Sequence, residues 1–377
     1  MSRKKQWFRG GYIAVYVGML VAGGIYIGVH PQKSYSANEN RYLTKLPEIT
    51  WEGIKKGEVQ DTLETAFCDQ FPARDTWLGI TTGIQRAMGN DCIRKVYLGK
   101  DDYYFEQVLD SDLSEKQYNT NLQVIEALRE EGIVTTCMLI PSPATIMKDK
   151  LPAHAVTYDS AKMCEEGEEL LQEDWLDISE ALLKAKEKVQ VYFRTDHHWT
   201  LAGAYEGYAA YCRHMGREPK EYAHFAPEKA SDTFLGTIYS KLLPVNPRKD
   251  DLYLAGNLPE NIEVVCDGKT HNGVYDREKL DTKDKYAVFF GGNYGKVEIT
   301  NPEAEKEKTL IVCKDSFANS MIPFLMEDYH KIIMLDLRYY TGSIKQLLDS
   351  YEQKEFLVLY EMSNFAKDDH LYRLIAE

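Results

Sequence analysis

The sequence predicts an α/β domain built on a parallel sheet that is flanked by helices, with a β-rich insertion and one N-terminal transmembrane helix ahead of it. Three observations predict this class. Continuous apolar runs of strand length alternate with amphipathic helical stretches, as is typical of parallel sheets. Short β-like pieces between turn formers interrupt this alternation at about residues 224–301. An uncharged apolar run lies near the N-terminus.

The N-terminal segment combines a basic tail with this apolar run. Residues 1–10 contain four basic residues and no acid, and the run from Gly11 to Val29 carries no charge. As a helix the run rises about 28 Å, close to the hydrocarbon thickness of a bilayer. We expect a cytoplasmic tail over 1–10 and an uncleaved signal anchor over 11–30, because basic flanks resist translocation. A cleaved signal peptide is the alternative, and both signals lead to export.

Residues 31–50 have few apolar side chains and several turn formers, which predicts a stalk between the membrane and a domain over 51–377. Within that domain we expect a helix from Ser114 to a stop at Gly132, then a strand over 133–140. A strand at 189–193 precedes a helix that Thr200 can cap. Further strands are expected at 286–290, 309–313, 331–335 and 356–360, and further helices at 318–327 and 344–351. Parallel strands joined by helices imply right-handed crossovers.

Charge and cysteine content exclude several classes of protein. The 377 residues carry a net charge of −14; removing the four positive charges of the tail leaves −18 for the remainder. Nucleic acid is therefore not expected as a partner, because phosphate binding needs a basic surface. The seven cysteines include no C-x-x-C pair, and Cys137, Cys266 and Cys313 lie in apolar runs. They do not indicate a disulfide framework.

Two polar segments each follow an expected strand and precede a helix: Arg194–Thr200 and Cys313–Ser320. Active sites of parallel sheets form at the carboxyl ends of strands. In an extended segment Asp196 and His198 share one face and His197 points to the other. Ser316 can stand on a tight turn whose free backbone N–H groups would bind an oxyanion. These residues suffice for a Ser-His-Asp triad.

Other interpretations of the same residues stay open. Ser316 can be an ordinary helix N-cap. Asp196, His197 and His198 can be metal ligands, although no third ligand segment has a recognisable spacing, so we expect neither a metal nor another cofactor.

The segment FRTDHHWT, residues 193–200, resembles the signature of the DHHW protein family, which is related to the periplasmic SGNH-hydrolase-like alginate O-acetyltransferases. Further stretches fit the same pattern: Glu39–Leu43 with Pro47, Phe71–Asp75, Gly99–Phe105, and Asp315–Ser320 with Asp336–Tyr340. The resemblance implies an SGNH-like α/β fold with the triad in the order Asp, His, Ser. Asp196 would then orient the base, His198 would be the base, and Ser316 would accept the acyl group.

The resemblance also implies partners. Similar proteins work beside a membrane-bound O-acyltransferase that passes acetyl groups outward, and they acetylate hydroxyls of exported polysaccharide. It therefore implies a membrane-anchored, extracytoplasmic O-acetyltransferase. An acetylesterase with the same triad and a non-catalytic glycan-binding subunit of a polysaccharide export complex are the alternatives. The charge of −18 would repel a polyuronate, so the glycan is left open.

Five further residues are candidates for contact with substrate. Gly292 and Asn293, in a glycine-rich turn, can supply oxyanion donors, although such turns are common for positive φ alone. Arg338 follows a strand and can bind an anion, or be an ordinary surface arginine. Trp199 can be a sugar platform, or part of the core. His197 is left to pack or to contact substrate.

Overall fold

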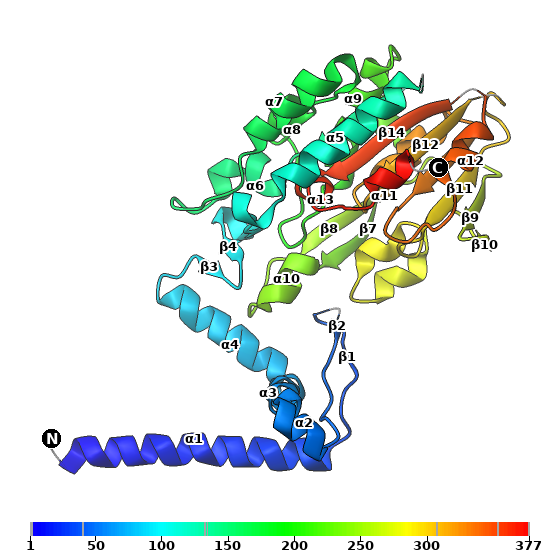
Figure 1. Cartoon of the computed structure of the whole chain (residues 1–377). Helices are drawn as coiled ribbons and strands as arrows, with labels where there is room; N and C mark the ends of the chain where they lie inside the picture. The colour runs from blue at the N-terminus through cyan, green and yellow to red at the C-terminus, as the bar shows by residue number, and fades with distance from the viewer. Residues whose placement is uncertain are drawn as a thin grey trace. The chain divides into compact units, whose positions relative to one another are not determined.

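A computed structural model describes residues 3–39, 41–131, 133, 135–306, 308–352 and 354–375, with side chains from Gly10 onward. The chain divides into two compact units. One comprises Met1–Asn90 with Ser240–Asn246, and the other comprises Asp91–Tyr239 with Pro247–Glu377 (Figure 1). The domain boundaries expected from the sequence stay a prediction, and Met1 and Ser2 of the expected tail lie outside the described residues.

The first unit is mainly helical. It contains α1 (Arg3–Val29), the two-stranded β1 (Tyr35–Ser36) and β2 (Arg41–Tyr42), α2 (Trp51–Lys56), α3 (Glu58–Gln70) and α4 (Arg74–Ala87). Within α1, Gly10–Val29 is long and apolar enough to cross a membrane. Arg41, in the expected stalk, donates hydrogen bonds to both oxygens of the buried Asp69 carboxylate, at 3.0 and 2.5 Å. This ion pair joins β2 to α3.

The second unit is organised by a seven-stranded sheet with the order β10-β9-β11-β13-β12-β14-β6. Its strands are β6 (Thr135–Ile140), β9 (Glu263–Cys266), β10 (Lys269–His271), β11 (Lys296–Thr300), β12 (Thr309–Lys314), β13 (Lys331–Leu335) and β14 (Lys354–Glu361). The four strands β13, β12, β14 and β6 pair in parallel. The other three pair antiparallel. The sheet is therefore mixed, because the expected insertion supplies three antiparallel strands to it.

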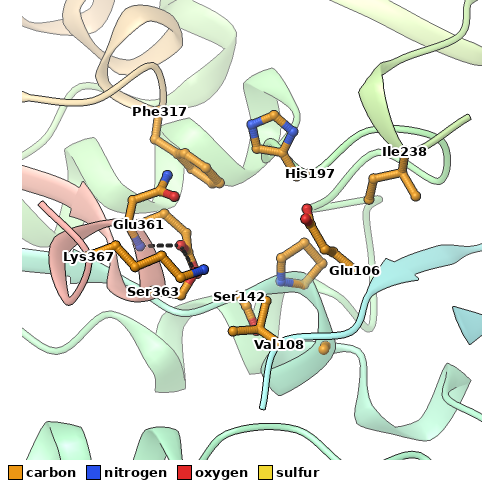
Figure 2. A pocket seen from close by; sticks show the side chains of 12 residues that line it. Glu106, Val108, Ser142, His197, Ile238, Phe317, Glu361, Ser363 and Lys367 are labelled. Atoms are coloured by element: carbon orange, nitrogen blue, oxygen red, sulfur yellow. Dashed lines mark hydrogen bonds between the residues drawn. The ribbon is translucent and has the colours of Figure 1, made fainter. Parts of the chain in front are cut away.

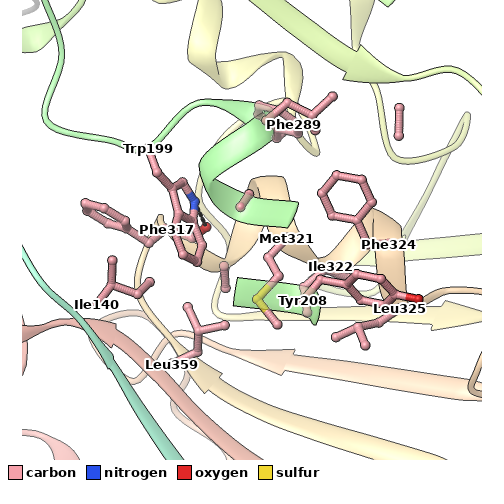
Figure 3. Packing of buried hydrophobic residues seen from close by; sticks show 14 of the residues in the cluster. Ile140, Trp199, Tyr208, Phe289, Phe317, Met321, Ile322, Phe324, Leu325 and Leu359 are labelled. Carbon is pink, nitrogen blue, oxygen red and sulfur yellow. Dashed lines mark hydrogen bonds between the residues drawn. The ribbon is translucent and has the colours of Figure 1, made fainter. Parts of the chain in front are cut away.

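Helices cover both faces of this sheet. Alternate residues of β12 point to opposite sides: Leu310 and Val312 pack with α9 (Leu201–His214) and α11 (Ala318–Leu325). Ile311 and Cys313 pack with α5 (Glu115–Glu130) and α12 (Ile344–Asp349). Figure 3 shows the first layer, where side chains of α9 and α11 lie against Ile140 and Leu359 of the sheet. A strand that is buried on both faces needs apolar residues on both, which explains the continuous apolar run in the sequence.

The remaining elements complete the described chain. The helices are α6 (Pro143–Ile146), α7 (Ser160–Leu171), α8 (Ser179–Ala185), α10 (Thr237–Leu242) and α13 (Met362–Phe365); the strands are β3 (Cys92–Ile93), β4 (Val96–Leu98), β5 (Tyr104–Glu106), β7 (Pro227–Phe234) and β8 (Asp250–Ala255). The 3-10 helices are Lys100–Asp102, Asp110–Asp112, Lys148–Lys150, Gln172–Asp174, Tyr222–Phe225, Arg277–Asp281, Lys285–Val288 and Leu371–Leu374. All seven cysteines are free.

Two of the expected helices begin at the capping residues that the sequence predicts. Ser114 caps α5 by accepting a hydrogen bond from the Gln117 amide, and Thr200 caps α9 by accepting one from the Gly203 amide. The expected stop at Gly132 lies outside the described residues.

Two expected strands are wrong. Residues 189–193 form only an isolated bridge, Tyr192 with Trp199, because the chain turns back on itself: the Thr200 amide donates to the Val191 carbonyl at 2.9 Å. Residues 286–290 lie mostly in the 3-10 helix Lys285–Val288. Their apolar side chains are buried against the core instead of lining a ladder. An apolar run of five residues does not by itself distinguish these conformations.

Candidate active site

Ser316 lies on the turn between β12 and α11, at the carboxyl end of the sheet's parallel strands. The buried carboxylate of Asp315 holds this turn. One of its oxygens accepts a hydrogen bond from the Phe317 amide at 2.9 Å. The other accepts from the Glu361 amide at 2.9 Å and from Asn364 Nδ2 at 2.8 Å. The turn is thus fastened to the end of β14 and to α13.

A second buried carboxylate, Asp250 at the start of β8, fixes the loop that carries Asp196. Its oxygens accept hydrogen bonds from the amides of Arg194 and Thr195 at 3.0 and 2.9 Å, and from the Thr195 hydroxyl at 2.8 Å. Asp250 is fully buried. Charge-assisted bonds to successive backbone N–H groups give this loop a definite shape without a strand.

Ser316, His198 and Asp196 form a continuous hydrogen-bonded chain. Ser316 Oγ lies 2.7 Å from His198 Nε2, and His198 Nδ1 lies 2.5 Å from Asp196 Oδ1. The His198 amide also donates to Asp196 Oδ1 at 2.9 Å. Because a carboxylate only accepts, Nδ1 carries the proton and Nε2 accepts from the serine hydroxyl. The arrangement can deprotonate Ser316 as it attacks a carbonyl carbon.

His197 does not point to the opposite face, as the extended-strand argument expected. Its ring centroid lies 3.9 Å from that of His198. The reason is the tight loop at 194–199, which brings consecutive side chains to one side. The pairing of Asp196 with His198 is as expected, but it arises from a local loop contact between residues two apart.

Asp196 also organises His197, through Thr237. Asp196 Oδ2 accepts hydrogen bonds from the Thr237 amide at 2.7 Å and from its hydroxyl at 3.0 Å. The same hydroxyl lies 2.7 Å from His197 Nδ1. Its one proton goes to the carboxylate, so it accepts from His197 Nδ1–H. A neutral His197 therefore keeps Nε2 unprotonated.

The protonation states follow from burial and from these contacts. Burial raises the pKa of Asp196, but the positive charges of His197 and His198 and the hydrogen bonds to His198 and Thr237 outweigh it and hold the pKa far below its usual range. Burial lowers the pKa of His198 to about 4; the charge of His197 adds to this effect and Asp196 opposes it. At neutral pH the pair is a carboxylate beside a neutral imidazole, which can act as a base.

Two aromatic residues hold the hydrogen-bonded residues Ser316, His198 and Asp196 in place. The Tyr286 ring stacks on His198 with 3.7 Å between centroids, and its hydroxyl bonds to Ser320 Oγ at 3.2 Å. Trp199 is fully buried, and its Nε1 donates to the Phe317 carbonyl at 3.0 Å and to Ser320 Oγ at 2.8 Å. Trp199 is therefore no sugar platform, because its faces are covered; it anchors the turn after Ser316.

A hollow that is partly open to solvent lies next to these hydrogen-bonded residues. His197 and Phe317, the neighbours of His198 and Ser316, line it (Figure 2). The rest of the lining mixes polar and charged residues with apolar ones: Glu106, Ser142, Glu361, Ser363, Asn364 and Lys367 with Val108, Pro143, Ala144 and Ile238. The hollow therefore lies next to the sequence neighbours of His198 and Ser316, where a substrate could enter.

The other substrate candidates lie elsewhere. Asn293 is exposed, and the described structure gives neither Gly292 nor Asn293 a hydrogen bond to Ser316, so their oxyanion role stays a prediction. Arg338 donates from Nε and Nη2 to the two oxygens of the buried Asp336, at 2.8 and 2.6 Å. Its guanidinium lines a second hollow together with Asp315 and Lys367.

The metal interpretation fits these contacts poorly. Ligand atoms of Asp196, His197 and His198 lie within 4.8 Å of one another. However, both ring nitrogens of His198 are engaged, one with Asp196 and one with Ser316, and His197 Nδ1 is engaged with Thr237. A metal ion would have to displace Asp196 or Ser316 from His198, and among the described contacts it is Nε2 of His197 that keeps a ring lone pair without a hydrogen bond.

Sequence reasoning missed Thr237, Asp250, Tyr286 and Asp315 as parts of this site. The first three lie in loops or short elements without a motif. Asp315 is next to Ser316 in the polar segment Cys313–Ser320, but no pattern in the sequence predicts its hydrogen bond to β14.

Two family models match the chain. Residues 176–335 match the model of the DHHW protein family, and residues 96–240 match that of the SGNH hydrolase-like domain of the acetyltransferase AlgX. Among curated proteins, the probable alginate O-acetylase AlgJ of Pseudomonas syringae pv. tomato is 27% identical over 207 residues. The match covers 51% of this chain and 49% of that protein, so the chain spans about half the length of this relative.

Solved structures share the fold. A DHHW family protein from Eubacterium siraeum superposes with a TM-score of 0.63 at 17% identity, covering 74% of this chain and 95% of the other. Bacillus cereus PatB1 superposes with a TM-score of 0.59 at 23% identity, covering 72% and 97%. A second PatB1 structure, with a sulfonyl adduct, gives 0.59 at 21% identity and covers 74% and 99%. Asp196, His198 and Ser316 all lie inside the DHHW match. The resemblance carried by FRTDHHWT is thus confirmed: the part of the chain that contains it matches the DHHW family model, and residues 96–240 are similar to the SGNH hydrolase-like domain of the acetyltransferase AlgX.

Proposed function

We propose that this protein is a membrane-anchored, extracytoplasmic O-acetyltransferase that acetylates a cell-surface or exported polysaccharide, with Ser316 as nucleophile, His198 as base and Asp196 as the orienting carboxylate. The observation that carries the proposal is the chain from Ser316 Oγ to His198 to Asp196, at 2.7 and 2.5 Å. The relation to alginate O-acetyltransferases supports acetyl transfer to polysaccharide as its chemistry.

The reaction proceeds in two halves. Ser316 Oγ attacks the carbonyl carbon of an acetyl donor while His198 Nε2 takes its proton, and the donor's leaving group departs with that proton. The acetyl ester of Ser316 is then attacked by a sugar hydroxyl, whose proton again goes to His198 Nε2. As the ester bond to the sugar forms, the ester bond to Ser316 breaks and the proton on His198 Nε2 returns to Ser316 Oγ.

Backbone groups would stabilise the oxyanion of both steps. Within the described residues the Ser316 amide makes no hydrogen bond, whereas the Phe317 amide is taken by Asp315. The Ser316 N–H is therefore the first donor we assign, with Gly292 and Asn293 as candidates for the second.

The N-terminal helix supports the proposed location. Gly10–Val29 is 20 residues long, and most of its side chains are exposed, as a lipid-facing helix requires. The basic tail would keep the N-terminus cytoplasmic and the site outside. A membrane-bound O-acyltransferase is the proposed acetyl donor, because an extracytoplasmic enzyme needs its acetyl groups passed across the membrane.

Acylation of Ser316 tests the proposal. The full-length protein in detergent is incubated with p-nitrophenyl acetate, and peptide mass spectrometry then locates any acetyl adduct. We expect the adduct on Ser316 and its loss in Ser316→Ala, whereas Ser350→Ala, at an exposed serine that ends α12, keeps it. An adduct and turnover that survive in Ser316→Ala would show that the nucleophile is wrong. Transfer to an added oligosaccharide, rather than to water, separates the transferase from an esterase.

A further inference from the structure

His197 is held in one orientation beside the proposed base. Its ring centroid lies 3.9 Å from that of His198, with 36° between the ring planes. Both rings turn Nδ1 toward the same carboxylate oxygen: Asp196 Oδ1 lies 2.5 Å from His198 Nδ1 and 3.7 Å from His197 Nδ1. The other ring nitrogen, Nε2, is therefore turned away from Asp196 in both residues.

Thr237 fixes which ring nitrogen of His197 carries the proton. Its hydroxyl donates to Asp196 Oδ2 at 3.0 Å, so it accepts from His197 Nδ1–H at 2.7 Å. Nε2 of neutral His197 is then an acceptor, and among the described contacts it makes no hydrogen bond. His198 Nε2, in contrast, already accepts from Ser316 Oγ. Two neighbouring imidazoles thus offer one lone pair in use and one that is unused.

The ring of His197 is accessible from the hollow beside Ser316. The His197 side chain is 31% exposed, whereas that of His198 is 6% exposed. His197 lines the hollow together with Phe317 and Ile238 (Figure 2). Because its Nδ1 edge is covered by Thr237, the edge that carries Nε2 is the one left for a solute in the hollow to contact.

We infer that the acceptor sugar presents a vicinal diol, two hydroxyls on neighbouring ring carbons, and that His197 Nε2 accepts a hydrogen bond from the hydroxyl that is not acetylated. The inference rests on the proposed function and names the substrate feature that the site selects. One hydroxyl gives its proton to His198 Nε2 as its oxygen attacks the acetyl ester; the ester bond to Ser316 then breaks, and Ser316 Oγ takes that proton. The neighbouring hydroxyl keeps its proton and donates a hydrogen bond to His197 Nε2. A sugar whose second hydroxyl is farther away can bond to only one of these adjacent rings.

Two cyclohexanediols that differ only in the spacing of their hydroxyls test this inference: the trans-1,2-diol and the trans-1,4-diol. The full-length protein in detergent is acetylated with p-nitrophenyl acetate, and the monoacetate of each diol is quantified by mass spectrometry. We expect kcat/KM for the 1,2-diol to exceed that for the 1,4-diol by about twofold to tenfold, as one hydrogen bond provides. His197→Phe, which keeps a ring without a lone pair, should remove this preference, and His197→Gln, whose amide oxygen can accept, should keep part of it. His154→Asn, at an exposed histidine, should keep all of it. A merely structural role of His197 would lower both rates alike.

Nitrogen-15 NMR of labelled histidine side chains gives a readout that needs no acetylation. In the unacetylated full-length protein, the Nε2 signal that either His197 variant removes should move when the 1,2-diol is added and stay in place with the 1,4-diol. Equal rates for the two diols, a preference that survives in folded His197→Phe, or an unmoved signal would overturn the inference. Failure of Ser316 to acquire acetyl concerns the proposed function alone, since the NMR titration does not depend on that step.

Discussion

Gly236→Ala should remove most acyl transfer although residue 236 touches no substrate. A Cβ built at Gly236 would lie 2.2 Å from both Cβ and Oδ2 of Asp196. The shortest ordinary contact for such an atom is 3.4 Å, so the carboxylate or the backbone must move by the difference, about 1.2 Å. The next residue, Thr237, donates to Asp196 at 2.7 and 3.0 Å, so these bonds change as well.

The size of the effect follows from the His198–Asp196 contact. A shift of about 1.2 Å would stretch the 2.5 Å bond between His198 Nδ1 and Asp196 Oδ1 beyond hydrogen-bonding distance. A misplacement of about 1 Å costs about 10²-fold in rate, and loss of the correct imidazole tautomer costs about 10⁴-fold. We therefore expect acylation of Ser316 to slow by about 10²- to 10⁴-fold.

Stopped-flow release of p-nitrophenol from p-nitrophenyl acetate measures this acylation rate directly. Gly83→Ala, at an exposed position of α4 where an added Cβ meets no atom, is the control; it should keep the rate and gain helix propensity. Circular dichroism shows whether both variants are folded. A folded Gly236→Ala protein that acylates within about threefold of the parent would refute the reasoning, because Asp196 would then not need its present place.

Four more outcomes follow from the same contacts. Because burial lowers the pKa of His198 to about 4, the acylation rate should rise with pH through a midpoint well below 6.5, and a midpoint near 7 would contradict this. The unfolded chain binds a proton on residue 198 more readily than the folded protein does. The free energy of unfolding that comes from keeping His198 neutral is therefore fully present above about pH 6.5 and is lost as the pH falls toward 4. This contribution amounts to about 3 kcal/mol and is measured by urea unfolding of the parent and of His198→Asn. His198→Ala should be as inactive as Ser316→Ala, while His197→Ala should keep acylation and lose mainly sugar affinity. Single-turnover acylation rates of the two histidine variants test this. An inactive His197→Ala beside an active His198→Ala would show that His198 is not the base. Exhaustive EDTA treatment should leave acylation intact, and a loss that one divalent ion restores would replace the triad with a metal site.

The sequence predicted the parts of the site that local patterns carry. The run at 309–313 is apolar from Leu310 onward because β12 is covered on both faces, and the polar segment after it had to lie at a sheet edge. Motif resemblance joined Ser316 to Asp196 and His198, which are 118 to 120 residues away in the chain. Spacing alone left the metal and N-cap interpretations open.

Other parts lay beyond such patterns. Tyr286 stacks on His198, and Thr237 bonds both Asp196 and His197, yet neither residue belongs to a motif. Their roles depend on where loops cross in space. The segment 286–290 shows the same limit, because five apolar residues are compatible with a strand or with a buried 3-10 helix.

The strand order also bears on when the site can form. Along the chain, β6 is the first strand of the large sheet, and its partner β14 is the last. β14 also pairs with β12 and ends at Glu361, whose amide holds the Ser316 turn through Asp315. Contacts of such high sequence separation form late and slowly. Under the proposed export and activity, a chain emerging from the translocation channel would stay chemically inert until residue 361 had cleared it, so acyl transfer would begin only after β14 was outside.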